Sequence, residues 1–199
     1  MLTVVIQAGG KSRRMGRNKA LVPFLEQSLI ERVYQRVEVL ATEVVVTTNN
    51  PETLQGLDAR LVIDRFPGRG ALGGLFTALD AAANPNVAVI ACDMPFVSAG
   101  LLSHQLELLA SEKCDAVIPK TSGGSEPFHA VYRRATCLKA VQRALQANSW
   151  RMDSWFGNVS VVYVVPEVIR RYDPHQLAFW NVNTPDELHC AEELAKVLD

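Results

Sequence analysis

Residues 3–19 read TVVIQAGGKSRRMGRNK, a strand-like apolar run that leads into two glycines and a cluster of cations. The β-branched residues from Val4 to Ile6 favour a β-strand. Gly9 and Gly10 allow the backbone to approach a ligand closely and to point successive N–H groups at it. Among the charges that follow, Arg14 and Lys19 add side-chain donors for an anion. The stretch therefore predicts a phosphate-binding loop after a first strand.

The spacing of this loop excludes two familiar phosphate-binding motifs. A Walker A loop needs Lys and then Ser or Thr directly after its second glycine, whereas Gly16 is followed by Arg17 and Asn18. Glycines at 9, 10 and 16 also do not match the dinucleotide pattern G-x-G-x-x-G. A solvated surface turn is the remaining alternative, but a turn rarely needs both a glycine pair and several cations.

Length and composition set the broad class of the protein. The chain has 199 residues, a formal net charge of −1 and 48% hydrophobic residues, which suits one domain over residues 1–199 with a sizeable core. A near-neutral chain argues against a nucleic-acid binder. No apolar run approaches the ~20 residues that span a bilayer, which argues against a membrane protein. The apolar segment at the start precedes its basic cluster, the reverse of a secretory signal, so we expect a cytoplasmic protein.

The four cysteines also point to a reducing compartment. They lie at positions 92, 114, 137 and 190 and form no C-x-x-C pair. We expect small buried thiols rather than a disulfide framework or a zinc site.

The pattern of apolar residues predicts the fold. Short apolar runs at 3–7, 44–46, 61–63, 87–91 and 116–118 indicate strands, and helical spacing appears at 28–40, 72–83 and 98–111, with Ser98 as a helix N-cap. Apolar strands that alternate with helices imply a mostly parallel sheet covered on both faces. We therefore predict a doubly wound α/β fold of Rossmann-like type, as a single three-layer domain whose ligands bind at the carboxyl ends of the strands.

Asp93 is the second candidate site residue. It follows the predicted strand 87–91 directly, where its carboxylate would face the ligand crevice. Burying a carboxylate without a partner is costly, so we expect a cation nearby. Mg²⁺ suits the position because it takes few protein carboxylates and completes its shell with water and phosphate oxygens. The alternative is a turn-forming or N-capping aspartate before Pro95.

Three further segments carry candidate residues. Residues 68–74 are rich in glycine, which suits close packing against a flat ligand such as a base, or a plain flexible loop. Glu126 and His129 lie in a segment that could line an acceptor site, although His129 suits a packed core position equally well. Asn181 and Asn183 place two amides on one face of an extended segment, before a helix that Thr184 and Pro185 would begin.

Taken in order, these motifs resemble those of the molybdenum cofactor guanylyltransferases. The resemblance extends over nearly the whole chain and rests on residues 9–16 with Lys19, 70–74, 92–95, 126–132 and 181–188. It implies transfer of GMP from GTP to molybdopterin carrying molybdenum, with release of pyrophosphate and with Mg²⁺ as cofactor. The nucleotide-binding part would span about 1–115, and the acceptor-binding part about 116–199.

The resemblance also implies roles for individual residues. Arg14, Lys19 and Asp93 would be catalytic, and Asp93 would bind the metal. The nucleotide would contact Gln7, Ala8, Gly9, Gly10, Gly16, Lys19, Thr47, Asp64, Ala71, Leu72 and Asp93. The acceptor would contact Glu126, His129, Asn181 and Asn183. The chain departs from the usual pattern where Gln7 replaces Leu, Asn18 replaces Asp, Ala71 replaces Pro and Thr47 replaces Asn.

Two alternative functions remain at this stage. The first is another Mg²⁺-dependent nucleotidyltransferase, which would use CTP with molybdopterin, methylerythritol phosphate or a sugar phosphate. The second is a non-catalytic GTP-binding adaptor that docks to molybdoenzyme maturation proteins. Transient contact with such proteins is also expected of the enzyme, as a monomer or weak homo-oligomer. An acceptor phosphate is already ionised at neutral pH, so the enzyme would need no general base to create its nucleophile.

Overall fold

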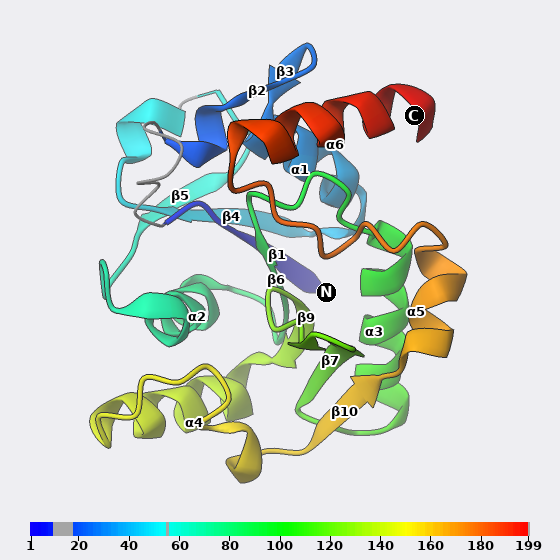
Figure 1. Ribbon diagram of the computed structural model, residues 1–199. Helices are drawn as coiled ribbons and strands as arrows, with labels where there is room; N and C mark the ends of the chain where they lie inside the picture. Colours follow the sequence, from blue (N-terminus) through cyan, green and yellow to red (C-terminus); the bar gives the residue numbers. More distant parts are fainter. Residues whose placement is uncertain (10–17, 55, 199) are drawn as a thin grey trace.

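Strand β1 (Leu2–Gln7) lies inside the central sheet of the computed structural model, which describes residues 1–9, 18–54 and 56–198 (Figure 1). The sheet has eight strands in the order β10-β7-β9-β6-β1-β4-β5, and β8 pairs with β7. The other strands are β4 (Glu43–Thr48), β5 (Arg60–Ile63), β6 (Asn86–Ala91), β7 (Ala116–Thr121), β8 (Gly124–Ser125), β9 (His129–Arg133) and β10 (Val161–Val164). A separate hairpin joins β2 (Pro23–Phe24) to β3 (Gln27–Ser28).

Most neighbouring strands in the sheet are parallel. β1 pairs in parallel with β4 and β6, β4 with β5, and β7 with β10. β9 alone among the long strands runs antiparallel, between β6 and β7. The mostly parallel α/β fold is therefore confirmed, and the local sequence pattern does not predict the antiparallel strand β9. The pairing of that strand depends on partners that lie far away in the chain, so a local pattern does not reveal it.

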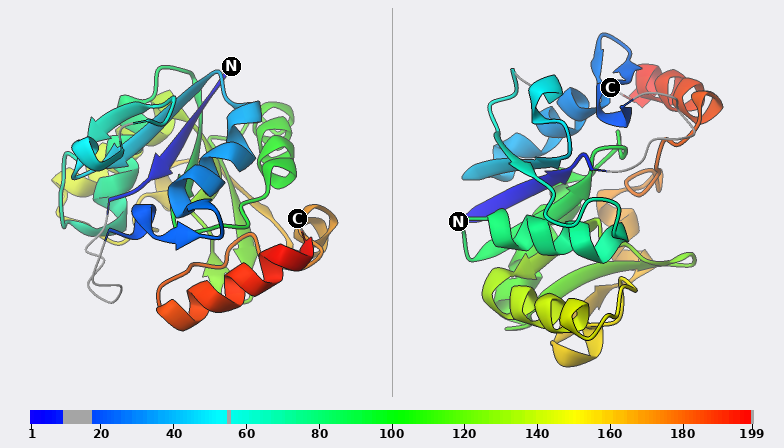
Figure 2. Two further views of the ribbon diagram at one scale, coloured as in Figure 1. Left: turned by 90° about the horizontal axis from the view of Figure 1, so that it is seen from above. Right: turned by 90° about the vertical axis from the view of Figure 1, so that its left-hand side faces the viewer.

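Helices cover both faces of the sheet (Figures 1 and 2). On one face, α1 (Leu29–Val37), α3 (Ala99–Ser111) and α5 (Pro166–Tyr172) pack through residues such as Val33, Leu101 and Ile169. On the other, α2 (Gly70–Ala81) and α4 (Arg134–Gln146) pack through Leu75 and Val141. Side chains at even positions of β1 pack into one core and Val5 packs into the other, because successive side chains of a strand point to opposite faces of the sheet.

A third, smaller core lies under the C-terminal helix α6 (Pro185–Leu198), which covers the β2–β3 hairpin region (Figure 1). Its buried members come from three parts of the chain: Val22, Phe24 and Leu29; Phe96; and Val182, Ala191 and Ala195. This core ties the end of the chain to the carboxyl edge of the sheet.

Most predicted helix bounds agree with the structure to within a few residues. The Ser98 side chain accepts a hydrogen bond from Leu101 N, which confirms it as the N-cap of α3. The predicted helix 28–40 is α1 followed by a 3₁₀ turn at Glu38–Leu40. Its start is fixed by Ser28 and Glu31, which form a reciprocal capping box. Further 3₁₀ turns lie at Lys19–Leu21, Pro51–Leu54 and Phe156–Asn158.

The four cysteines are free thiols, as predicted. Cys92, Cys114 and Cys137 are buried, but Cys190 is exposed, so the expectation of burial is wrong for that residue. Cys190 lies on α6, which covers only the small third core. In the described ranges, no helix has the length and apolar character that a membrane crossing needs.

Candidate active site

Three side chains from distant parts of the chain meet at the carboxyl edge of the sheet. The Lys19 ammonium donates to Asp93 Oδ2 at 2.6 Å and to Asn183 Oδ1 at 2.7 Å. The side chains of Lys19 and Asp93 are each 17% exposed. The cation predicted near Asp93 is therefore present, and it is Lys19. A partly buried ion pair that opens to solvent leaves both groups reachable by a ligand.

The sheet itself positions Asp93. Cys92, the residue after β6, donates from its backbone N to Gln7 O at 3.0 Å, which continues the β1–β6 pairing. Asp93 then leaves the sheet, and its carbonyl accepts from Val182 N at 2.9 Å. The aspartate is thus held between a central strand and the segment that carries Asn183.

Asn183 is fixed by the start of α6. Glu187 Oε2 accepts from the backbone N of Asn183 at 2.6 Å and of Thr184 at 3.0 Å, while Thr184 Oγ1 accepts from Glu187 N at 3.2 Å. This arrangement confirms Thr184 as the capping residue and Pro185 as the first residue of the helix. Asn183 Nδ2 donates to Asn181 O at 3.0 Å, which leaves Asn183 Oδ1 aimed at Lys19.

The two asparagines make different hydrogen bonds. Asn181 Nδ2 donates to Phe179 O at 3.1 Å, whereas Asn183 Oδ1 accepts from the Lys19 ammonium at 2.7 Å. Asn181 thus helps to hold the segment, and Asn183 belongs to the polar group around Lys19.

A second polar group lies at the ends of β1, β4 and β5. A Cβ added to Gly9 would lie 3.8 Å from Asp64 Oδ2 and 3.9 Å from Asn49 Nδ2. Asp64 Oδ1 accepts from Phe66 N at 3.0 Å and from Thr77 Oγ1 at 2.8 Å, so the carboxylate is held in place. Asn49 was missed by the sequence analysis, although its position directly after the strand β4 was the available signal.

Thr47, Leu72 and His129 lie in the interior. Their exposed fractions are 3%, 0% and 0%. Thr47 contributes its carbonyl, which accepts from Ala8 N at 2.8 Å, and Leu72 packs in the core between α2 and the sheet. The contacts of these residues with a ligand stay predictions.

His129 occupies a packed core position, one of the two placements that the sequence allows. Its Nε2 accepts from Ser98 N at 3.1 Å, and Phe179 lies edge-on to its ring at 5.1 Å between centroids. Burial lowers the pKa of His129 to about 4, so the ring is neutral at physiological pH. It supports the turn after Asp93, and its contact with an acceptor stays a prediction.

The remaining predicted residues occupy the same edge or lie outside the described residues. Ala8 and Gln7 are partly exposed, Ala71 is exposed, and Glu126 is partly buried and accepts from Thr121 Oγ1 at 3.3 Å. Burial raises the pKa of Glu126. The Gln7 amide packs against α2, since a Cβ on Gly74 would lie 2.8 Å from Gln7 Oε1. Gly10, Arg14 and Gly16 lie outside the described residues.

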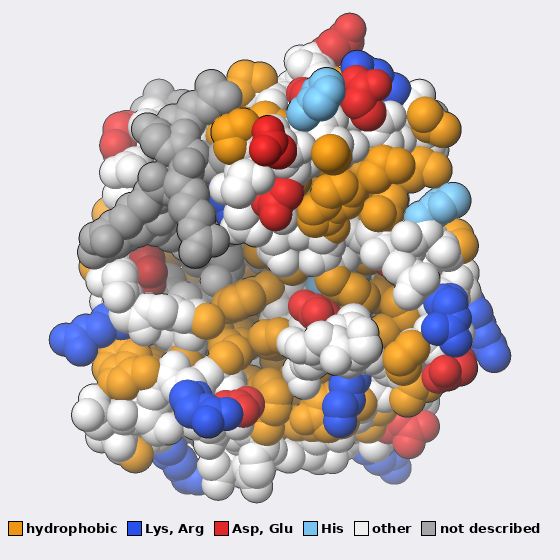
Figure 3. Space-filling view, viewed as in Figure 1, with side chains coloured by type: hydrophobic (Ala, Val, Ile, Leu, Met, Phe, Trp, Pro, Cys, Tyr) orange, Lys and Arg blue, Asp and Glu red, His pale blue; other side chains and the backbone are white. Residues whose placement is uncertain are grey.

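The face of the molecule seen in Figure 3 is hollowed in the middle, and the hollow is lined largely by hydrophobic side chains. A pocket of about 480 Å³, which the sequence analysis did not anticipate, lies between α2 and α4. Phe66, Phe76 and Trp150 form its apolar wall, and the Arg69 guanidinium lies 5.2 Å from the centroid of the Trp150 ring.

The donor set around Lys19 fits a magnesium ion. Asp93 Oδ2 and Asn183 Oδ1 are hard oxygen ligands that already converge on one cation, the Lys19 ammonium. In the ranges that the structure describes, no group of three His, Cys, Asp or Glu side chains gathers as a metal site. Mg²⁺ is usually held by one or two carboxylates together with substrate phosphates, and Asp93 supplies such a carboxylate.

A mostly parallel α/β sheet, with a lysine, an aspartate and an amide oxygen at its carboxyl edge and with Gly9 just beyond the end of its first strand, defines a protein of the nucleotidyltransferase class. Residues 4–158 match the model of the MobA-like NTP transferase domain. The chain belongs to that family.

Related proteins cover nearly the whole chain. It is 36% identical to a probable molybdenum cofactor guanylyltransferase of Pelotomaculum thermopropionicum, over 98% of this chain and 93% of that one. It is 32% identical to the molybdenum cofactor guanylyltransferase of Desulfosudis oleivorans, over 98% and 96% of the two chains.

Solved structures agree with this assignment. The molybdopterin-guanine dinucleotide biosynthesis protein A of Archaeoglobus fulgidus superposes with a TM-score of 0.84 at 29% identity, over 98% of this chain and 99% of that chain. The 2-C-methyl-D-erythritol 4-phosphate cytidylyltransferase of Thermus thermophilus has a TM-score of 0.70 at 19% identity, over 96% and 98% of the chains, and shares the fold.

Proposed function

We propose that this protein transfers GMP from GTP to molybdopterin carrying molybdenum, which yields the guanine dinucleotide form of the cofactor and pyrophosphate. The meeting of Lys19, Asp93 and Asn183 carries the proposal, because it gathers a cation and two oxygen ligands where a nucleotide would bind in this fold. Full-length relatives that bear the guanylyltransferase name support the choice of substrate.

In the proposed reaction, a phosphate oxygen of the acceptor forms a bond to the α-phosphorus of GTP. The bond from that phosphorus to the bridging oxygen breaks, and pyrophosphate leaves with the electron pair. Because the acceptor phosphate is already ionised, catalysis consists of alignment and charge stabilisation. Lys19 would turn from Asp93 towards the phosphates and offset their charge, and Arg14 of the loop would share that role.

Asp93 and Asn183 would hold Mg²⁺, which when bound neutralises phosphate charge and orients the leaving group. Asp64 and Asn49 would hold the nucleoside end of GTP next to Gly9, where the absence of a side chain leaves room for a close approach. The backbone N–H groups at the start of α2, including those of Ala71 and Leu72, have no partner within the helix and can serve the same nucleotide.

We further propose that the nucleotide lies on residues of about 1–115 and that the acceptor lies against residues of about 116–199, including Glu126 and Asn181. The free thiols suit work in a reducing cytoplasm. Contact with molybdoenzyme maturation proteins, and a monomeric or weakly associated state, stay predictions.

The test is a nucleotide panel with the purified chain. GTP, CTP, ATP and UTP are each supplied with Mg²⁺ and molybdenum-loaded molybdopterin, and pyrophosphate release is followed. We expect release with GTP and formation of the guanine dinucleotide. Preference for CTP would favour the cytidylyltransferase alternative, and GTP binding without pyrophosphate release would favour the adaptor.

A pair of matched variants separates the site from general damage. Asp93→Asn removes the charge that faces Lys19. The control Asp80→Asn removes a carboxylate on α2 that lies 2.7 Å from the Arg65 guanidinium. We expect loss of turnover only in the first variant. Equal turnover in both would remove Asp93 from the proposed mechanism.

A further inference from the structure

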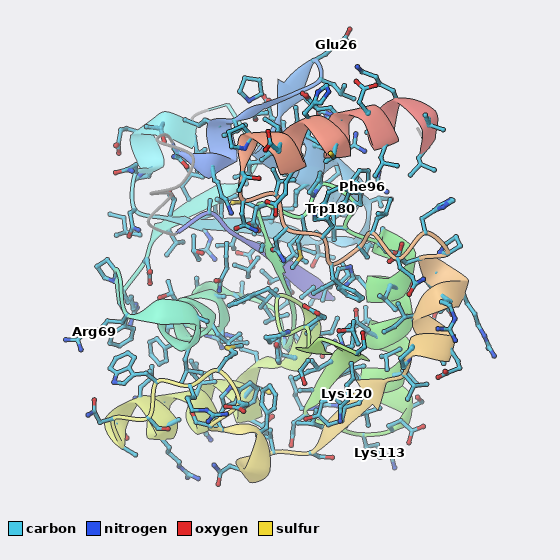
Figure 4. All side chains as sticks on the ribbon, viewed as in Figure 1. Glu26, Arg69, Phe96, Lys113, Lys120 and Trp180 are labelled. Atoms are coloured by element: carbon cyan, nitrogen blue, oxygen red, sulfur yellow. The ribbon has the colours of Figure 1, made fainter. Side chains whose placement is uncertain are left out.

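The three segments that carry Lys19, Asp93 and Asn183 also contact one another through aromatic side chains. Phe24 and Phe96 lie a few positions after Lys19 and Asp93 in the chain, and Trp180 lies a few positions before Asn183. All three aromatic residues belong to the small core under α6 or pack against it. Figure 4 shows Phe96 and Trp180 together under α6.

Arg32 of α1 lies within this aromatic group. The residue is only 5% exposed, and its guanidinium carbon lies 4.8 Å from the centroid of the Phe24 ring and 5.6 Å from that of Phe96. The two rings stand edge to face, with centroids 6.4 Å apart. Phe96 in turn stacks on Trp180 at 6.1 Å and 24°. We call Arg32, Phe24, Phe96 and Trp180 the Arg32 cluster.

The same arginine holds the backbone that carries Asp93. Arg32 Nε donates to Pro95 O at 2.9 Å in a buried hydrogen bond, two residues beyond Asp93. On the far side of the aspartate, Val182 N donates to Asp93 O at 2.9 Å and joins it to the Asn183 segment. A shift of Pro95 would therefore move the Asp93 carboxylate relative to both Lys19 and Asn183.

A guanidinium suits this place better than an ammonium. Its planar face stacks on aromatic rings, while its N–H groups keep a fixed direction towards the carbonyl. A lysine would keep the charge but lose that geometry. Simple packing would not require a buried cation there, since burying a charge is costly unless it is well partnered.

We propose that Arg32 is a positioning residue for the active site: through Pro95 and the rings of Phe24 and Phe96 it sets the placement of Asp93 against Lys19 and Asn183. The inference rests on the proposed function, because that function makes Lys19, Asp93 and Asn183 active-site residues. Their placement can nevertheless be measured without an activity assay.

The test compares Arg32→Lys with Arg134→Lys in the full chain. Arg134 is a matched control, because it also donates to backbone carbonyls, those of Leu79 at 2.9 Å and Asp80 at 3.1 Å, on the opposite face of the sheet. Urea unfolding and circular dichroism establish that each variant is folded. Phe24→Leu, which removes one ring and keeps the arginine, serves if Arg32→Lys does not fold.

The first readout needs no activity. The rate of acetylation of Lys19 by acetic anhydride, measured by peptide mass spectrometry without nucleotide, reports how firmly the ammonium is held by Asp93 and Asn183. We expect it to rise by about fivefold in Arg32→Lys, as for a weakened ion pair, and to stay unchanged in Arg134→Lys. An unchanged rate in a folded Arg32→Lys protein would overturn the proposal.

The second readout uses turnover. The Mg²⁺ concentration for half-maximal rate should rise by about 10–100-fold in Arg32→Lys, the usual cost of disturbing a group that supports a metal ligand, while the control keeps the wild-type value. A change of equal size in both variants would also overturn the proposal. If the wild type itself releases no pyrophosphate, the proposed function fails, and the acetylation result still decides whether Arg32 places Lys19 and Asp93.

Discussion

Acidification should destabilise the protein through one buried histidine. His129 is fully buried, its Nε2 accepts from Ser98 N, and within the described residues its Nδ1 has no hydrogen-bond partner. Because burial disfavours the charged ring, the pKa of His129 falls from 6.5 to about 4. The unfolded chain therefore binds a proton between these pH values that the folded chain does not bind, and stability is lost as pH falls through this window.

The size of the effect follows from the two pKa values. With the unfolded ring at 6.5 and the folded ring at about 4, lowering the pH from 7.5 to 5.0 removes about 2 kcal/mol of unfolding free energy. The perturbation is His129→Gln, which keeps an acceptor for Ser98 N and cannot titrate. Urea unfolding at both pH values, for wild type and variant, gives the difference, because all other titrating groups are common to both.

We expect the wild type to lose about 2 kcal/mol more than His129→Gln on acidification. Equal losses in the two proteins would mean that the folded ring takes up its proton at an ordinary pH, and the reasoning from burial would be refuted. A larger loss in the variant would refute it as well.

Three other predictions concern the site and the packing beside it. Asp93→Ala and Lys19→Ala should each lower turnover by about 10²–10³ with melting unchanged within a few degrees, and near wild-type turnover in steady-state assays would contradict their roles. Removal of divalent ions with EDTA should abolish pyrophosphate release, and Mg²⁺ should restore it; activity that survives chelation would exclude the metal. Gly73→Ala should lower the free energy of unfolding by about 1 kcal/mol or more, because the added Cβ would lie 2.8 Å from the Phe66 Cβ. In the control Gly157→Ala the added Cβ has nothing within 4 Å, so urea unfolding should give a change within about 0.5 kcal/mol.

Local signals in the sequence predicted the alternating elements well. The apolar runs that became β1, β4, β5 and β6 are short, β-branched and bounded by polar residues, so each carries its own evidence. Ser98 and Thr184 cap helices as their positions indicate. Such features depend on neighbours within a few residues, which a sequence displays directly.

Features that depend on distant partners were less accessible. β9 forms between β6 and β7, and its apolar segment gives no hint of an antiparallel direction. The meeting of Lys19 with Asp93 was anticipated only as an unspecified cation, and its contact with Asn183 was not anticipated. His129 could not be placed from the sequence because its burial depends on Ser98 and Phe179, which come from other elements.

The contact between Lys19 and Asn183 spans 164 positions of the chain. During synthesis, a growing polypeptide can therefore complete β1 and most of the sheet while it still lacks the amide oxygen of Asn183 that finishes the polar group. A nascent chain of that kind would lack part of the proposed metal and nucleotide site until the segment around residue 183 has emerged and docked. Catalytic competence in this protein should thus appear late, as a property of the finished fold rather than of its first half.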